Sequence, residues 1–216
     1  MRIAEIISEG VNDPHIFKAL FVAGTPGAGK NTVIRDLGLN STGLKMIDAD
    51  KVIALLHKSH NDQSYASTRN TLDKRRAMFK QQMLGMLINT TGRDYEATTA
   101  INDELKTAGY DTFMLFVEVD EQVAWSRAQD RKKYATNPVD QRDVTKDYFD
   151  KAYPDSMRNQ SLYAMEFGDN YAKVTNNEDR VVEDEETFAS TIANAARKIR
   201  RFLAKPVDLP NQNLLK

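Results

Sequence analysis

The chain has 216 residues, of which 41% are hydrophobic and 28% charged, and this balance predicts a folded globular protein rather than a disordered or fibrous one. It contains no cysteine and no run of about 20 apolar residues, which excludes disulfide partners, a cysteine nucleophile, thiolate-bound zinc and a membrane span. A formal net charge of -1 argues against a protein that coats nucleic acid through bulk electrostatics.

The N-terminal residues MRIAEIISEG place charges before the apolar stretch and carry no small-residue cleavage pattern, so we expect no secretory signal and a cytoplasmic location. The length fits one domain over residues 1–216. We expect its core at 16–177, a closing helix at 185–204 and a short tail at 205–216.

Short apolar runs predict five strands. The first and strongest runs from Ile16 to Ala23, is almost continuously apolar and ends at a glycine, as expected of a strand that is buried on both faces. The other four are expected, in chain order, at 44–47, 86–89, 113–119 and 171–175.

Helical patterns alternate with these strands. Gly109 is a typical stop signal for the helix before it, and the polar stretch at 59–68 is expected to interrupt helical structure. The expected helices cover 29–37, 51–57, a segment from Arg69 onward, 94–108, 121–133, 148–167 as one or two helices, and 185–204.

Strands that alternate with helices of this length predict an α/β fold, in which a mostly parallel sheet carries helices on both faces. Sheets of this kind bind ligands beyond the carboxyl ends of their strands. The residues that directly follow each strand are therefore the first candidates for a functional site.

A glycine-rich loop follows the first predicted strand and opens the first predicted helix. The segment GTPGAGK, from Gly24 to Lys30, matches G-x-x-x-x-G-K in the structural context that a phosphate-binding loop (P-loop) requires. Backbone N–H groups of such a loop surround phosphate oxygens, and the lysine reaches the outer phosphates. We therefore predict binding of ATP by Gly24, Thr25, Pro26, Gly27, Ala28, Gly29, Lys30, Asn31 and Thr32.

The residue after the P-loop lysine departs from the usual pattern. This position normally carries a serine or threonine that ligates Mg²⁺, whereas this chain has Asn31. An amide oxygen can ligate a hard cation, so we predict Asn31 as a metal ligand. Thr32 is rotated by about 100° on a helix and is no simple substitute. The alternative is a nucleotide-binding protein with weakened metal binding and little activity.

Two carboxylates end the second predicted strand in the segment IDAD. In a phosphoryl-transfer site one acid steadies Mg²⁺ while another accepts the proton of the substrate hydroxyl. We assign the catalytic base to Asp50 and predict Asp48 as a metal and substrate ligand. The alternative is a helix cap, with Asp50 at the N-cap position.

Polar groups also follow the third and fourth strands. Those expected to bind the acceptor are Asn89, Thr90, Thr91 and Arg93. Those expected to form a lid that neutralises charge during transfer are Arg127, Arg131 and Arg142. Arg127 and Arg131 share one face of a helix because they are four residues apart.

Basic residues form three clusters, which favour a polyanionic acceptor or, alternatively, are solvated helix faces. The first contains Arg69, Lys74, Arg75, Arg76 and Lys80. The second contains Arg127, Arg131, Lys132 and Lys133, and the third contains Arg197, Lys198, Arg200, Arg201 and Lys205.

Taken together, these segments resemble the P-loop kinases of the zeta-toxin-like and polynucleotide-kinase-like group. The resemblance extends from about Phe17 to Asn177 and is carried by GTPGAGKN, IDAD, INTTGRDYEATTAINDELKTAGYDTFMLFVEV and RAQDRKKYATNPVDQRDV. It implies a three-layer P-loop kinase fold with an arginine-bearing lid, catalysis by Lys30, Asp50 and lid arginines, and ATP with Mg²⁺ as cofactors. Those kinases usually carry an acid before T-G-R, where this chain has Asn89.

The same layout, including the segment FGDNYAKVTNNE near its end, also resembles kinases of tailed bacteriophages, some of which phosphorylate hydroxymethylated pyrimidines in DNA. The expected function is therefore an ATP-dependent kinase that phosphorylates a hydroxyl of a nucleic-acid or nucleotide-like acceptor, the most specific candidate being such a base in phage DNA. A phage-encoded kinase would act in the cytoplasm of the bacterial host. The alternatives are a zeta-toxin-like kinase of nucleotide sugars and a regulatory ATP-binding module.

Overall fold

The computed structural model describes residues 13–56, 62–134, 144–177 and 188–206. Within these residues five strands form a single sheet in the order β2-β3-β1-β4-β5, and each neighbouring pair runs parallel. The central strand β1 is buried along its whole length, which explains its continuous apolar sequence. The strands are β1 (Lys18–Ala23), β2 (Lys45–Ile47), β3 (Met86–Asn89), β4 (Asp111–Glu118) and β5 (Tyr171–Thr175).

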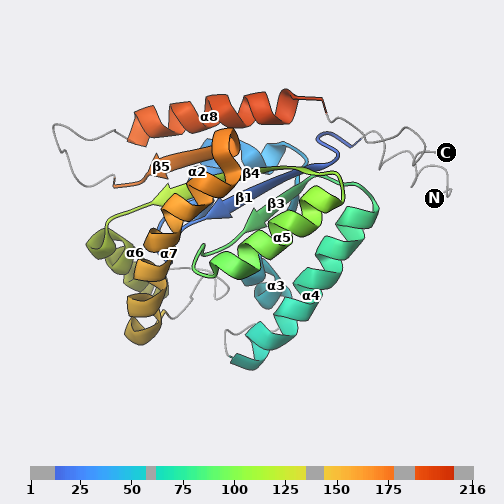
Figure 1. Cartoon of the computed structure of the whole chain (residues 1–216). Coiled ribbons are helices and arrows are strands. Elements are labelled where there is room, and N and C mark those ends of the chain that lie inside the picture. The colour runs from blue at the N-terminus through green and yellow to red at the C-terminus, as the bar shows by residue number, and fades with distance from the viewer. Residues whose placement is uncertain (1–12, 57–61, 135–143, 178–187, 207–216) are drawn as a thin grey trace.

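Helices cover both faces of the sheet. In Figure 1, α2 and α8 lie on one face, α4 and α5 lie on the other, and α6 lies near the carboxyl ends of the strands. The helices are α2 (Lys30–Asp36), α3 (Ala49–Leu56), α4 (Asp62–Gln81), α5 (Tyr95–Thr107), α6 (Glu121–Tyr134), α7 (Lys146–Phe167) and α8 (Phe188–Ala204), and short 3-10 helices cover Leu39–Ser41 and Gly168–Asn170.

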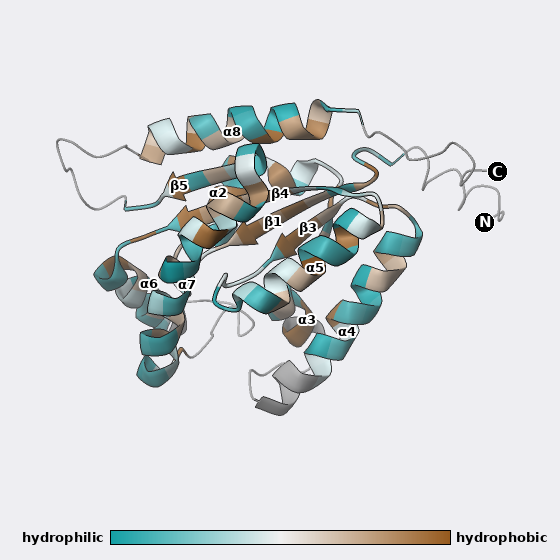
Figure 2. Cartoon of the chain, in the orientation of Figure 1, coloured by the Kyte–Doolittle hydropathy of each residue, from teal (hydrophilic) through white to brown (hydrophobic). Residues whose placement is uncertain are grey.

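The alternation of side chains along β1 divides the hydrophobic core into two parts. Leu20 and Val22 point into the part beneath α2 and α8, whereas Ala19, Phe21 and Ala23 point into the part beneath α4 and α5. Figure 2 shows the hydrophobic strands enclosed between helices whose outer faces are hydrophilic. The sheet is thus the middle of three layers, as the sequence predicts.

Helix α7 contributes to both parts of the core. Its first half supplies Phe149 to the part that contains α8, and its second half supplies Tyr163 and Phe167 to the part that contains α5. Thr145 caps this helix, because its hydroxyl accepts a hydrogen bond from the backbone N–H of Tyr148 at 3.3 Å. The sequence left open whether 148–167 forms one helix or two. The structure has one helix, with Pro154 inside it.

The predicted elements match the structure within a few residues, with one exception. The polar stretch over 59–68 predicts an interruption of helical structure, but α4 begins at Asp62 and continues to Gln81. The polar residues of this stretch include neither glycine nor proline, and such residues are compatible with a helix. Polarity alone is therefore a poor signal for a break. None of the helices in the described ranges has the length and apolar character needed to cross a membrane.

Candidate active site

The P-loop connects the end of β1 to the start of α2, as predicted. Lys30 is the first residue of α2, and its Nζ donates hydrogen bonds to the carbonyl oxygens of Gly24 at 2.7 Å and Thr25 at 3.4 Å. The backbone N–H of Ala28 donates to the carbonyl of Thr25 at 3.1 Å, which closes a tight turn. The lysine is thus folded back over the loop that it follows.

Two glycines of the P-loop are required by their surroundings. Gly27 and Gly29 have φ values of 83° and 79°, a region that side chains with a Cβ rarely occupy. A Cβ at Gly27 would lie 2.0 Å from the carbonyl oxygen of Ala124 on α6, and one at Gly29 would lie 2.3 Å from Nδ2 of Asn176. The loop therefore packs directly against α6 and the segment after β5.

A pocket of about 250 Å³ lies over the P-loop. Most of the predicted site residues line it: Thr25, Pro26, Gly27, Ala28, Gly29, Lys30, Asn31, Thr32, Asp50, Asn89, Thr91, Arg127 and Arg131. Its wall also contains Ala128 and Val144, which the sequence analysis does not nominate. Among the other predicted residues, Gly24, Asp48, Thr90 and Arg93 are outside the wall, and Arg142 lies outside the described residues.

The two acids of IDAD have different surroundings. Asp50 is in the first turn of α3 and faces the pocket, where its Oδ2 lies 3.9 Å from Nη2 of Arg131. Asp48 is buried, and its Oδ1 accepts hydrogen bonds from the backbone N–H groups of Asp50 at 2.8 Å and Lys51 at 3.3 Å. The capping carboxylate is therefore Asp48, whereas the alternative considered above assigned the cap to Asp50.

The end of β3 contributes an amide to this region. Asn89 donates from Nδ2 to Oδ2 of Asp48 at 2.7 Å, and its own Oδ1 is buried with no hydrogen-bond partner among the described residues. A carboxylate accepts hydrogen bonds and cannot donate them, so the contact fixes which end of the amide faces Asp48. Asn89 is also one of the residues that line the pocket.

Arg127 is attached to the segment that follows β5. Its Nη1 donates to the carbonyl of Asn176 at 2.8 Å, and the side chain of Asn176 donates to the carbonyl of Ala28 in the P-loop at 2.8 Å. Asn176 is 3% exposed, so this link is part of the interior. The sequence analysis misses Asn176, although its position directly after a predicted strand could have nominated it.

The loop after β3 is held from two sides. The hydroxyls of Thr90 and Thr91 accept hydrogen bonds from the N–H groups of Gly92 at 3.2 Å and Arg93 at 3.5 Å. Carbonyl groups of the loop point to α7, where Ser156 donates to the carbonyl of Thr91 at 2.8 Å. The threonines therefore shape the loop that the sequence analysis predicted for acceptor binding.

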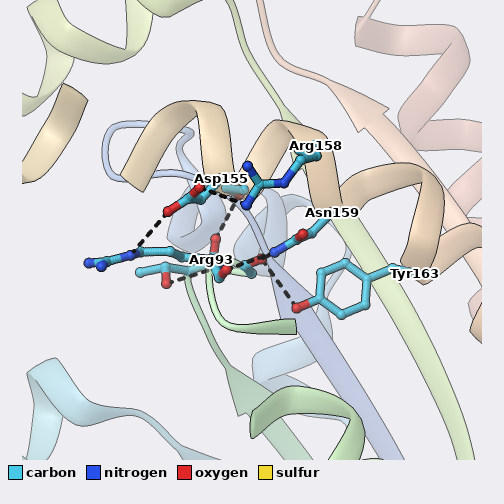
Figure 3. A network of polar contacts seen from close by, with 8 residues as sticks. Arg93, Asp155, Arg158, Asn159 and Tyr163 are labelled. Carbon is cyan, nitrogen blue, oxygen red and sulfur yellow. Dashed lines mark hydrogen bonds and ion pairs between the residues drawn. The ribbon is translucent and has the colours of Figure 1, made fainter. Parts of the chain in front are cut away.

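Two further α7 side chains complete this contact (Figure 3). Asn159 donates from Nδ2 to the carbonyls of Gly92 at 3.1 Å and Arg93 at 2.7 Å, and the hydroxyl of Tyr163 donates to Gly92 at 3.2 Å. Burial raises the pKa of the Tyr163 phenol to about 12, so the hydroxyl keeps its proton at neutral pH. On the surface nearby, Arg93 lies 3.6 Å from Asp155 of the same helix.

Residues suited to a metal ion are sparse. The described residues contain no group of three or more histidine, aspartate or glutamate side chains that could hold a metal. Asn31 is exposed and lines the pocket, so its amide oxygen fits a cation that enters with a nucleotide. Asp48 fits less well, because both of its carboxylate oxygens already accept hydrogen bonds from the chain.

A parallel sheet of this order, with a P-loop after its central strand and a facing acid and arginine, defines a protein of the P-loop kinase class. The family model "Zeta toxin" matches residues 9–187. The chain belongs to the zeta toxin family, and it is an ATP-dependent kinase of that group.

Solved structures agree with this fold. A candidate kinase from Chloroflexus aurantiacus is 14% identical at a TM-score of 0.59, covering 88% of this chain and 99% of its own. A protein of the PezAT chromosomal toxin–antitoxin system of Streptococcus pneumoniae is 13% identical with a TM-score of 0.55, and the match covers 94% of this chain and 96% of that protein. A chain of the AvrRxo1-ORF1:AvrRxo1-ORF2 complex with ATP is 10% identical with a TM-score of 0.60, and the match covers 97% of this chain and 73% of that chain. No curated protein sequence matches the chain.

Proposed function

We propose that this protein transfers the γ-phosphoryl group of ATP to a hydroxyl group of a nucleotide-like acceptor. The observation that carries the proposal is the convergence of Lys30, Asp50 and Arg131 on one pocket, with the carboxylate of Asp50 3.9 Å from the guanidinium of Arg131. A phosphate-binding cation, a base and a second cation are the groups that phosphoryl transfer requires.

In the proposed reaction, Asp50 accepts the proton of the acceptor hydroxyl as its oxygen forms a bond to the γ-phosphorus. The bond from that phosphorus to the bridging oxygen breaks, and ADP leaves. Lys30, Arg127 and Arg131 neutralise the charge that moves during transfer. When Mg²⁺ is bound, it neutralises charge on the phosphates, and Asn31 would hold it.

A compact acceptor is favoured over a long nucleic acid. Part of the first basic cluster is used within the protein, because Arg76 pairs with Asp73 at 2.9 Å and with Glu104 at 3.5 Å, and Lys80 pairs with Glu104. Among compact acceptors, the resemblance of the sequence to zeta-toxin-like kinases makes a nucleotide sugar the first candidate. A hydroxymethylated pyrimidine in phage DNA stays a prediction from sequence.

The test is transfer of labelled γ-phosphate from ATP in the presence of Mg²⁺. Acceptors are offered in parallel: UDP-sugars, nucleosides, DNA and RNA ends, and DNA with hydroxymethylated pyrimidines. Lys30→Ala should abolish transfer, and Asp50→Asn, which keeps the shape of the side chain and removes the base, should lower it by at least about 100-fold.

The outcomes separate the candidate functions. Label on a UDP-sugar, together with growth inhibition of an expressing bacterium that Asp50→Asn relieves, supports the proposal. If DNA is labelled and the labelling declines steeply with salt, the acceptor is a nucleic acid and not a nucleotide sugar. ATP binding with no label on any acceptor would favour the regulatory module, and full activity of Asp50→Asn would remove Asp50 as the base.

A further inference from the structure

The carboxylate of Asp48 accepts hydrogen bonds at both of its oxygens. One oxygen accepts from the backbone N–H groups of Asp50 and Lys51, and the other accepts from the amide of Asn89 at 2.7 Å. The residue is 5% exposed and does not line the pocket. A carboxylate in this position contributes through the groups that it holds.

The groups that Asp48 holds include the proposed base. The hydrogen bond from the N–H of Asp50, at 2.8 Å, fixes the first turn of α3 and therefore the direction in which the Asp50 side chain leaves the helix. The second contact anchors this turn to the last residue of β3. Asp48 thus connects the carboxyl ends of β2 and β3 at the place where Asp50 enters the pocket.

The amide at position 89 matches this arrangement. Asn89 can donate a hydrogen bond to a carboxylate, whereas an acid at the same position would place two negative charges at hydrogen-bonding distance. Related kinases carry an acid before T-G-R, where this chain has Asn89. The replacement by an amide is explained here by the hydrogen bond that Asn89 donates to Asp48.

We propose that Asp48 and Asn89 are a pair of positioning residues that set the carboxylate of Asp50, and that Asp48 is not a ligand of Mg²⁺. This inference rests on the proposed function, in which Asp50 is the base. Of the two predicted metal ligands, Asn31 and Asp48, it keeps only Asn31.

Four variants separate positioning from metal binding. Asp48→Asn keeps the cap, since an asparagine oxygen can accept from the same backbone groups, and the Asn89 amide can turn to accept from the new amide. Asp48→Ala removes both contacts, and Asn89→Asp creates two facing carboxylates. The double variant Asp48→Asn/Asn89→Asp exchanges donor and acceptor and restores the contact. Lys51→Ala, an exposed side chain of the same turn, is the control.

With the acceptor found in the transfer assay, we expect kcat to fall about 10- to 100-fold in Asp48→Ala and Asn89→Asp, because small displacements of a reacting group are costly. Asp48→Asn and the double variant should keep most of the activity, with an unchanged KM for ATP and an unchanged requirement for Mg²⁺. A loss in Asp48→Asn as large as in Asp48→Ala, with a raised Mg²⁺ requirement, would overturn the proposal.

Thermal unfolding gives a readout that does not depend on activity. The midpoint should fall by about 2–4 °C in Asp48→Ala and Asn89→Asp, and the double variant should recover it. If the double variant recovers its unfolding midpoint but the wild-type protein phosphorylates no acceptor, the pairing of Asp48 with Asn89 stands and the proposed kinase function is refuted. A double variant no more stable and no more active than Asn89→Asp would refute the pairing itself.

Discussion

The P-loop and the loop over residues 90–93 follow neighbouring strands, β1 and β3, but they are held in shape in different ways. The P-loop is shaped mainly by its own glycines and by Lys30, which donates back to Gly24 and Thr25 within seven residues of chain, and the carbonyl of Ala28 also accepts a side-chain hydrogen bond from the distant Asn176. The second loop also has local hydrogen bonds to the hydroxyls of Thr90 and Thr91. Its carbonyl groups, however, accept from Ser156, Asn159 and Tyr163 of α7, between 65 and 71 residues away.

The two loops differ in how far they can be predicted from sequence. A loop that is determined by its own residues leaves a motif, whereas a loop that is determined by a distant helix leaves only ordinary polar side chains on that helix. It also divides the pocket by expected function, since the P-loop faces the nucleotide and the second loop was predicted to face the acceptor. Variants of each loop should therefore have separable effects.

The largest effect is expected from Gly27→Ala. Its Cβ would lie 2.0 Å from the carbonyl oxygen of Ala124, at a φ of 83°, so the unfolding free energy should fall by about 3 kcal/mol and ATP binding should be lost. Gly38→Ala is the matched control, because its φ is also positive, at 67°, but no atom lies within 4 Å of the added carbon. Urea denaturation and calorimetry with ATP measure both. Equal losses in the two variants would contradict a role for packing against α6.

A smaller effect, confined to the other loop, is expected from Asn159→Ala. It removes this donor from the carbonyls of the buried Gly92 and of Arg93, which should lower the unfolding free energy by about 2 kcal/mol. Transfer should decline while ATP affinity is retained. Ser161→Ala, an exposed position of α7, should change stability by less than about 0.5 kcal/mol. An equal decline of ATP affinity and transfer would show that the two loops are not separable.

The smallest effect is expected from Tyr163→Phe, which removes only a hydroxyl and should cost about 1 kcal/mol at neutral pH. Because the folded pKa of about 12 exceeds the unfolded value of about 10, the phenol adds stability that is complete below pH 10 and is lost as the pH rises toward 12. The variant should therefore lose less stability over this range. Denaturation curves at pH 8 and pH 11 measure the difference, and identical losses would rule out this contribution.

Much of the fold follows from the sequence by the same reasoning. The continuous apolar run and the glycine-rich motif predicted a strand, a loop and a helix in this order, and the structure has them as β1, the P-loop and α2, with a pocket over the loop. The start of α4 was missed, since polar residues in 62–68 do not distinguish a helix from a loop. The pairing of Asp48 with Asn89 could not be predicted, because the two residues meet only in the folded sheet. Asn176 could have been nominated from its place after a strand, but its contact with Ala28 could not.

The contact of α7 with residues 91–94 also constrains the order of assembly. A chain leaving the ribosome completes β1, the P-loop and β3 well before α7 exists, since Asn159 is 67 residues beyond Gly92. Until α7 docks, the carbonyls of this loop are hydrated by water. If this loop binds the acceptor as proposed, we expect competence for transfer to be acquired late in synthesis, after the chain has passed residue 163.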